Sequence, residues 1–316
     1  MTDGRARPGN SAAVEVRELV KSYSGRRVVD GLSFSVAAGE VFALLGPNGA
    51  GKTTTVEILE GYRRADSGVV RVLGLDPVRD ARALKQQIGL MLQQGGLFPQ
   101  ITVVEALRLF AAFYPDPEDP ETVLDQLQLR EAAKTRFRQL SGGQKQRLSL
   151  GLALIGKPRL VFLDEPTAAM DPQARRATWS IIRLLTQQGT TVLLTTHFMD
   201  EAEQLANRVA IVDRGRLVAL DSPATLRQTV ANEVRFATEP SVPERDVAAA
   251  LGVPADAVER ENDGTLVVRL EPSPELVAEL AAWLARRGIL LTELRAGSRT
   301  LEQAFLTLTT SNDDAA

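Results

Sequence analysis

The chain has 316 residues, 44% hydrophobic and 24% charged, which is ordinary for globular protein and long enough for two domains. Its net charge of -3 gives no general attraction to nucleic acid, so we expect no nucleic-acid partner. With no cysteine and one histidine, His197, the sequence excludes disulfides, thiolate metal sites and multi-histidine metal centres.

The N-terminal part predicts a tail followed by two strands. Residues 1–13 are polar and lack the apolar core of a signal sequence, so we expect a disordered tail and a cytoplasmic protein. Residues 14–19 and 32–36 alternate apolar and polar side chains, as half-buried antiparallel strands do. Tyr23 lies between them in a turn-like segment. Its ring could stack on a base, although an ordinary loop tyrosine is the simpler interpretation.

A phosphate-binding loop follows. Residues 46–53 fit the pattern G-x-x-x-x-G-K-[ST], between a short buried strand predicted at 40–45 and a helix predicted from residue 54. Glycines let backbone N–H groups wrap anionic phosphates, and the helix points its positive end at them. Lys52 would reach the β- and γ-phosphates, and the Thr53 hydroxyl would hold Mg²⁺. The residues expected to bind ATP here are Gly46, Pro47, Asn48, Gly49, Ala50, Gly51, Lys52, Thr53 and Thr54.

The middle of the chain predicts an inserted helical lobe. Apolar residues repeat at helical spacing, three prolines interrupt the chain, and a second helix follows. We therefore expect a helical subdomain over about 95–158. The expected elements are strands at 69–73 and 88–92 and helices at 77–87, 103–113 and 121–127.

A second anion site is predicted at the start of a later helix. Ser141 can serve as an N-cap, and Gly142 and Gly143 leave N–H groups exposed at the helix end. Taken alone, such a segment is more often an ordinary loop.

An acidic pair follows an apolar strand. Residues 160–163 are entirely apolar, which predicts a strand in the centre of a parallel sheet. Ligands bind at the carboxyl ends of such strands, so Asp164 should lie near Mg²⁺ and Glu165 near a water molecule that it can activate. The alternative is a simple acidic turn.

The next segments predict a strand at 191–195 that ends near His197, a hairpin of strands at 209–212 and 217–220, and a helix at 223–230. A lone histidine after an apolar strand is as often structural as functional.

Taken together, residues from about 14 to 230 resemble the nucleotide-binding subunit of ABC transporters, whose motifs occur here in the family's order. The resemblance implies an α/β fold, the P-loop NTPase of ABC cassette type, with a mixed central sheet, an antiparallel β subdomain and a helical subdomain. It also implies that ATP and Mg²⁺ are bound. Tyr23 would stack on the adenine, and ATP would be contacted by the signature residues Ser141, Gly142, Gly143 and Gln144 and by the D-loop aspartate Asp171. Glu165 would act in catalysis as general base, together with His197, Gln93 and Lys52. The metal ligands would be Thr53, Gln93 and Asp164.

Finer stretches at 57–62, 196–202 and 219–223 resemble the daunorubicin-type drug-resistance branch. The resemblance implies a homodimer with each ATP between the phosphate loop of one copy and the signature of the other. It implies a peripheral position at the cytoplasmic face of the membrane, on a separate ABC-2 type permease that exports drugs, antibiotics or other hydrophobic compounds. One departure concerns the D-loop, usually Ser-Gly-Leu-Asp, which here reads Ala168-Ala169-Met170-Asp171. A hydroxyl that can hydrogen-bond across the dimer interface is lost.

Residues 233–310 predict a separate small α+β domain, after a cassette domain at 14–232. The order strand–helix–strand–strand–helix–strand is ferredoxin-like, and Asn262-Asp263-Gly264 favours a hairpin turn. We expect a packing or dimer-stabilising role, with ligand sensing or permease docking as alternatives. The expected strands are 234–237, 257–260, 266–270 and 290–294, and the helices are 244–251, 275–287 and 301–308, before an acidic tail at 311–316.

Three other functions stay open. An importer subunit would carry the same motifs. A soluble ABC ATPase acting on ribosomes or DNA would usually have two cassettes or a long coiled-coil insertion, and this sequence has neither. A nucleotide-gated module without turnover would not need Glu165 and His197.

Overall fold

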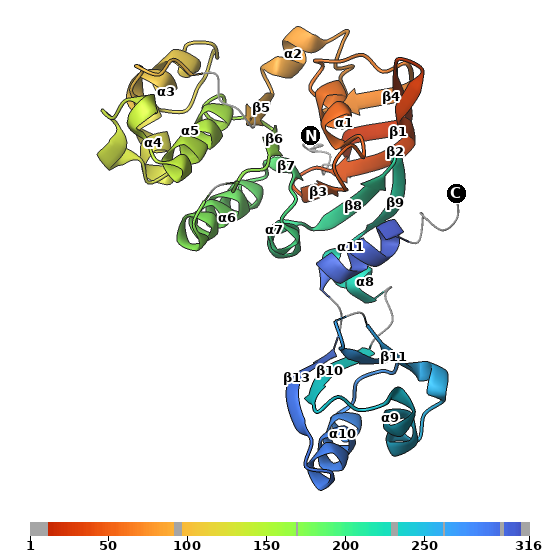
Figure 1. Ribbon diagram of the computed structural model, residues 1–316. Helices are drawn as coiled ribbons and strands as arrows, with labels where there is room; N and C mark the ends of the chain where they lie inside the picture. Colours follow the sequence, from red (N-terminus) through yellow and green to blue (C-terminus); the bar gives the residue numbers. More distant parts are fainter. Residues whose placement is uncertain are drawn as a thin grey trace, which may run out of the picture. The chain divides into compact units, whose positions relative to one another are not determined.

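The computed structural model describes residues 12–91, 97–168, 170–228, 233–261, 263–297 and 300–310. The chain divides into two compact units, Met1–Pro223 and Ala224–Ala316 (Figure 1). The domain boundary was predicted at residue 232, whereas the second unit begins at Ala224. Residues 229–232 lie outside the described residues. The predicted tail at 311–316 also lies outside them, whereas Ala12 and Ala13, assigned to the N-terminal tail, belong to the first strand.

A mixed six-stranded sheet forms the centre of the first unit. In order across the sheet, its strands are β5 (Ile88–Met91), β6 (Leu160–Asp164), β7 (Thr191–Thr195), β3 (Val41–Leu45), β8 (Arg208–Asp213) and β9 (Arg216–Asp221). Neighbouring strands are parallel except for β8 and β9, which form the predicted antiparallel hairpin. β3 and β7 are buried along their whole length, and β6 up to its last residue, as expected of parallel strands covered on both faces.

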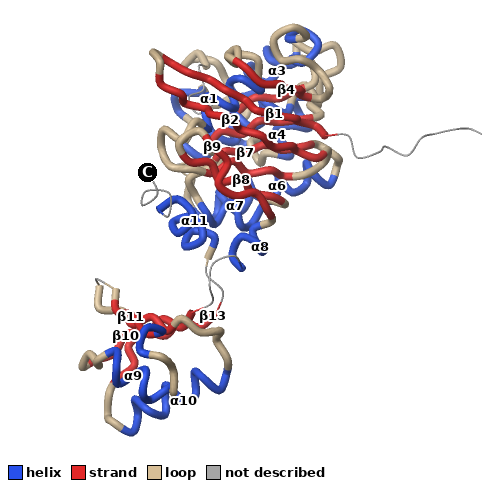
Figure 2. Tube along the Cα trace, turned by 90° about the vertical axis from the view of Figure 1, so that its right-hand side faces the viewer, coloured by secondary structure: helices blue, strands red, loops and turns tan. Residues whose placement is uncertain are grey.

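An antiparallel sheet of β2 (Arg26–Ala37), β1 (Ala12–Tyr23) and β4 (Ser67–Val72) lies against the main sheet (Figure 2). The turn predicted around Tyr23 was placed too early, since Tyr23 is the last residue of β1 and pairs with Arg26. The turn itself is Ser24-Gly25, with φ of 49° and 81°. Two positive φ values give the type I′ geometry that suits the twist of a hairpin.

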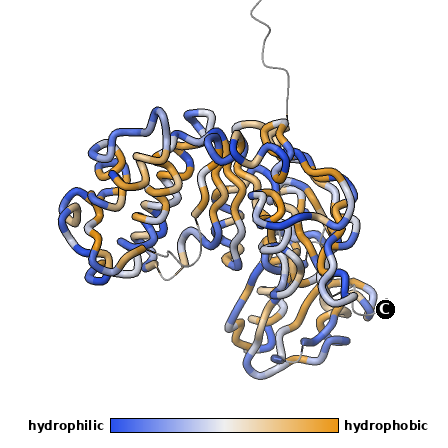
Figure 3. The backbone as a smooth tube through the Cα atoms, turned by 90° about the horizontal axis from the view of Figure 1, so that it is seen from above, coloured by the Kyte–Doolittle hydropathy of each residue, from blue (hydrophilic) through white to orange (hydrophobic). Residues whose placement is uncertain are grey.

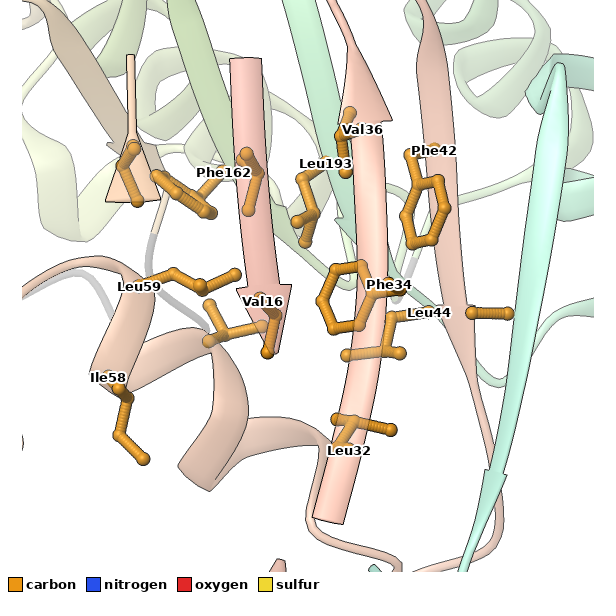
Figure 4. Close-up of a cluster of buried hydrophobic side chains, with 14 of the residues drawn as sticks. Val16, Leu32, Phe34, Val36, Phe42, Leu44, Ile58, Leu59, Phe162 and Leu193 are labelled. Carbon is orange, nitrogen blue, oxygen red and sulfur yellow. The ribbon is translucent and has the colours of Figure 1, made fainter. Parts of the chain in front are cut away.

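The two sheets share one hydrophobic core. Phe34 of the antiparallel sheet stacks on Phe42 of β3, with ring centroids 5.3 Å apart, and Leu59, Phe162 and Leu193 pack in the same cluster (Figure 4). Figure 3 shows hydrophobic residues concentrated along the strands in the middle of this unit. Burying a side chain as large as phenylalanine contributes about 1.5–3 kcal/mol, so this core fixes the two sheets relative to each other.

The helices of the first unit are α1 (Lys52–Leu59), α2 (Ala81–Lys85), α3 (Val103–Ala111), α4 (Pro120–Gln126), η1 (Arg130–Ala132), η2 (Phe137–Gln139), α5 (Gly142–Leu154), α6 (Pro172–Gln187) and α7 (Met199–Leu205). Figure 1 shows α3, α4 and α5 grouped together as the predicted helical lobe. The helix predicted at 77–87 is shorter, since α2 begins at Ala81 after a turn in which the Asp76 carboxylate accepts the N–H groups of Val78 and Arg79. No helix was predicted from the sequence at α6 or α7.

The second unit has the ferredoxin-like order that the sequence predicted. Its elements are α8 (Pro223–Gln228), β10 (Glu233–Glu239), α9 (Glu244–Leu251), η3 (Ala255–Ala257), β11 (Val258–Arg260), β12 (Leu266–Val268), α10 (Pro274–Arg286), β13 (Leu290–Gly297) and α11 (Leu301–Thr310). The strands form an antiparallel sheet of order β11-β12-β10-β13, with α9 and α10 packed on it around Phe236 and Trp283. Of the predicted hairpin turn, Asn262 lies outside the described residues. In the described part of the chain, none of the helices has the length and apolar character that crossing a bilayer requires.

Candidate nucleotide-binding site

The phosphate loop, the acidic pair and the histidine follow neighbouring strands. The loop follows β3, Asp164 ends β6 with Glu165 directly after it, and His197 follows β7. The three strands are parallel and adjacent in the order β6-β7-β3, so their carboxyl ends open on the same edge of the sheet. Side chains that lie far apart in the sequence are therefore gathered at one place.

Glycines in the phosphate loop are required by close approaches of the backbone. A Cβ on Gly46 would lie 2.2 Å from the carbonyl oxygen of Val212, and one on Gly51 would lie 2.5 Å from that of Val28. Gly51 also has a φ of 98°, which side chains rarely tolerate. Because Gly51 precedes α1 without a capping side chain, the first N–H groups of the helix remain available to an anion.

Lys52 extends back over the loop that precedes it. Its Nζ donates to the carbonyl oxygens of Gly46, at 2.7 Å, and Pro47, at 3.0 Å. Burial lowers the pKa of the Lys52 ammonium, and the negative charges of Glu165 and Asp164 partly offset that effect. The ammonium thus lies near the acidic pair, and its hydrogen-bond acceptors in the described part of the chain are neutral carbonyl oxygens. Anionic phosphate oxygens would be stronger acceptors for it.

The acidic pair is fixed by its surroundings. The Thr195 hydroxyl donates to the Asp164 carboxylate, and Gln146 Nε2 of α5 donates to the backbone carbonyl of Glu165 at 2.9 Å. Glu165 has a left-handed backbone with a φ of 48°, and its N–H donates to the Thr195 carbonyl at 2.9 Å. The Glu165 Oε1 lies 3.0 Å from Nδ1 of His197. A carboxylate in contact with an imidazole at the edge of a phosphate loop is suited to proton transfer.

Residues 29–168 match the family model described as ABC transporter. Over 307 residues the chain is 34% identical to the daunorubicin/doxorubicin resistance ATP-binding protein DrrA of Streptomyces peucetius, an alignment that covers 94% of this chain and 92% of that protein. The chain belongs to the ABC transporter family. It is also 42% identical over 228 residues to the Nod factor export ATP-binding protein I of Paraburkholderia xenovorans (strain LB400), covering 71% of this chain and 74% of that one.

Solved structures share the fold of the cassette. One ATP-binding subunit of an ABC transporter superimposes with a TM-score of 0.63 at 27% identity, covering 69% of this chain and 92% of that chain. Another ATP-binding cassette of an ABC transporter, in its ADP conformation, superimposes with a TM-score of 0.61 at 25% identity, covering 67% of this chain and 91% of that chain. As a member of this family, the protein binds ATP and is an ATPase coupled to transport.

The segment predicted to be the ABC signature leads into α5. Ser141 Oγ accepts the N–H of Gln144 at 3.2 Å, and the Gln144 side chain accepts the N–H of Ser141 at 2.9 Å, which together form a capping box. The predicted N-cap is therefore confirmed. Since the Ser141 hydroxyl acts as an acceptor in this cap, its own proton is left to donate to a ligand. Ser141 and Gly142 are exposed, so both can be reached by a partner.

The D-loop leads into α6. The Asp171 carboxylate accepts the N–H groups of Gln173 and Ala174, each at 2.9 Å, and so caps the helix. Two of the residues that differ from the family's usual D-loop are Ala169 and Met170. Met170 is buried, and its sulfur accepts a hydrogen bond from the Thr178 hydroxyl, whereas Ala169 lies outside the described residues.

The adenine and Q-loop predictions have less structural support. The Tyr23 ring is 37% exposed, and two cations lie near it, Lys21 Nζ at 5.5 Å and the Arg63 guanidinium at 5.6 Å from its centroid. Its role in adenine stacking stays a prediction. Gln93 lies outside the described residues.

Sequence reasoning missed a buried carboxyl group beside the site. Glu60, at the end of α1, is 5% exposed. Burial, together with the charges of Asp164 and Glu57, raises the pKa of Glu60 to about 8. Nothing in the sequence pattern distinguishes Glu60 from an exposed helix-end glutamate, because its burial arises from tertiary packing. Gln146 was missed for the same reason.

Proposed function

We propose that this ATPase powers export of a drug, an antibiotic or another hydrophobic compound through a separate ABC-2 type permease. The observation that carries the nucleotide chemistry is the meeting of Lys52, the acidic pair and His197 at the carboxyl ends of β3, β6 and β7. Export is supported by the two relatives, one named for daunorubicin and doxorubicin resistance and the other for Nod factor export. In this proposal the protein works at the cytoplasmic face of the membrane, held there by the permease.

Within the site, binding and hydrolysis fall to different residues. Lys52 exchanges its carbonyl partners for the β- and γ-phosphates. Glu165 takes the proton of the attacking water as general base, which typically supplies a 10²–10⁴-fold acceleration. His197 contacts Glu165 through Nδ1, which leaves Nε2 for the γ-phosphate. Catalysis of this kind consists of positioning and charge neutralisation.

The residues present fit a Mg²⁺ ion shared with the nucleotide. Among the described residues, no group of three or more His, Cys, Asp or Glu side chains is placed to hold a metal ion. Magnesium bound with ATP needs only one or two protein oxygens, because phosphates and water complete its shell. Asp164, partly exposed, and Thr53, exposed in the first turn of α1, would supply them, with Gln93 as a further ligand. The ion would neutralise charge on the phosphates.

Two copies are needed in this proposal. One phosphate loop binds one side of ATP, and the signature Ser141-Gly142-Gly143, with Gln144 and Asp171, binds the other side from the second copy. The exposure of Ser141 and Gly142 and the spare hydroxyl proton of Ser141 support this arrangement. ADP offers less charge to both sides, so the dimer opens after hydrolysis.

Glu165→Gln tests the nucleotide chemistry. The variant should bind ATP normally, release phosphate at least a hundredfold more slowly, and accumulate as a closed dimer with ATP. A matched control is Glu131→Gln, the same change on an exposed side chain of η1, which should hydrolyse ATP like the wild type. Normal phosphate release by purified Glu165→Gln would refute the assigned base.

Export itself is tested in cells. Deletion of the gene should sensitise the source organism to the exported compound, and only a copy with intact Lys52 should restore resistance. The chain should also co-purify from membranes with a multi-span protein. Recovery of the chain without such a partner, or dependence of uptake rather than efflux on it, would refute the exporter assignment.

A further inference from the structure

Besides Glu60, a second carboxyl group is buried, next to the loop that follows Glu165. Glu201 of α7 is fully buried. Its Oε1 accepts two hydrogen bonds, from the Thr167 hydroxyl at 2.8 Å and from Trp179 Nε1 of α6 at 3.1 Å. The Thr196 hydroxyl lies close enough to this carboxyl group to offset part of the effect of burial on its pKa. The Glu201 side chain thus joins the loop after β6 to α6 and to its own helix, α7.

The two threonines lie on the segments that carry the catalytic residues. Thr167 is two residues after Glu165, in the loop whose N–H groups bond back to it: Ala168 N–H donates to the Glu165 carbonyl at 3.1 Å. Thr196 directly precedes His197, and its Oγ1 accepts the N–H of Phe198 at 3.0 Å. The turn that presents the imidazole is therefore closed by a hydroxyl that also faces Glu201.

An outer layer holds the imidazole from the same two helices. The ring of Phe198 packs on that of His197 with centroids 4.0 Å apart. The Arg175 guanidinium of α6 lies 4.3 Å from the centroid of the Phe198 ring and pairs with Asp200 of α7 at 3.2 Å. Because both layers connect α6 to α7, a shift between these helices would move His197 relative to Glu165.

The environment of the Glu201 carboxyl group is not one that stability alone would favour. Its Oε2 has no hydrogen-bond partner among the described residues, and burial raises the pKa of the carboxyl group. A buried carboxyl group with an unsatisfied oxygen is costly, and a side chain of similar size that cannot ionise is often neutral or stabilising in its place. Charge-assisted hydrogen bonds are about twice as strong as neutral ones, which suits a group that must hold several loops in one geometry.

We propose that Glu201 is a positioning residue for ATP hydrolysis, which sets the His197 imidazole against the Glu165 carboxylate by tying their two loops to α6 and α7. The proposal rests on the proposed roles of Glu165 and His197. Glu201 touches neither nucleotide nor water in this account and acts only through the loops that it joins.

Glu201→Gln, in the purified full-length chain, is the direct test. It keeps the shape and the acceptor oxygen but removes the charge. We expect phosphate release to fall at least about tenfold, because small displacements of a catalytic group cost that much or more. ATP affinity and the thermal midpoint should stay at or above the wild-type values. Thr167→Val, which removes one donor at constant size, should act in the same direction, and Glu131→Gln should not. Turnover within twofold of wild type in both Glu201→Gln and Thr167→Val would overturn the proposal.

A double-mutant cycle separates positioning from folding. If Glu201 acts through His197, Glu201→Gln should lower the residual turnover of a His197→Ala chain less than twofold. Equal losses in both backgrounds, with a lowered thermal midpoint, would show a structural role and refute the proposal. A His197→Ala chain that hydrolyses ATP normally would instead refute the proposed role of His197. Normal turnover by Glu201→Gln beside an impaired His197→Ala would refute the positioning role alone.

Discussion

Replacing Glu60 by glutamine should stabilise the cassette relative to the wild type, and this gain should grow as the pH rises. In the folded chain the pKa of this carboxyl group is about 8, against 4.5 as the ordinary value, mainly because the group is buried. Between these two values the unfolded chain releases the proton while the folded chain keeps it. Folding therefore takes up a proton, and this residue lowers stability progressively from about pH 4.5 to about pH 8. Below that window both states are protonated and Glu60 contributes nothing.

The magnitude follows from linkage. One pKa unit corresponds to about 1.4 kcal/mol, so Glu60→Gln should gain about 3 kcal/mol of unfolding free energy at pH 7 and about 5 kcal/mol above pH 8. Near pH 4.5 the variant and the wild type should unfold alike. Denaturant unfolding of the cassette, followed at half-unit pH steps from 5 to 8.5, measures the difference. Magnesium and nucleotide should be left out, because a cation beside Asp164 would offset one of the charges that raise the pKa of Glu60.

A matched control comes from Glu131→Gln, which makes the same substitution on an exposed side chain of η1. The reasoning fails if the free-energy difference between Glu60→Gln and the wild type stays constant from pH 5 to pH 8. It also fails if the variant becomes less stable toward alkaline pH.

Three further changes test the loop and the signature. Lys52→Ala should weaken ATP binding at least tenfold by removing the ammonium that pairs with phosphates, and unchanged affinity in calorimetry would contradict this. Gly46→Ala should cost about 3 kcal/mol, since its Cβ would lie 2.2 Å from the Val212 carbonyl oxygen; a wild-type denaturation midpoint would argue against that close approach. Ser141→Ala should cost about 1 kcal/mol through the lost cap and reduce ATP-dependent dimerisation, which sedimentation with a non-hydrolysed ATP analogue would measure.

Strands with one clear environment were predictable from the sequence. β3 and β6 are buried on both faces, so their unbroken apolar runs identify them, and the turn residues beside them mark their ends. The second unit was predictable in order for a similar reason, because each short element alternates with a clear Gly, Pro or Asp break. Boundaries were less accurate where a turn runs directly into a helix, as the turn that follows Asp76 does before α2.

The chemistry of the site was predictable only for residues in local motifs. Lys52, Ser141 and Glu165 lie at fixed offsets from glycines or from a strand end, and those offsets are visible in the sequence. Glu60 and Glu201 carry the same side chain as many exposed glutamates of this chain. What distinguishes them is burial by segments distant in sequence, and the two hydrogen bonds of Glu201 come from the loop after β6 and from α6. No single-sequence pattern reports such contacts.

The left-handed backbone of Glu165 has a practical consequence for engineering. A non-glycine residue at a φ of 48° carries a steric penalty of about 1–2 kcal/mol, which glycine would relieve. A library screened for heat resistance alone would therefore enrich glycine at this position and return a robust chain that no longer turns over. Any directed evolution of this protein should select for phosphate release and heat tolerance in the same round.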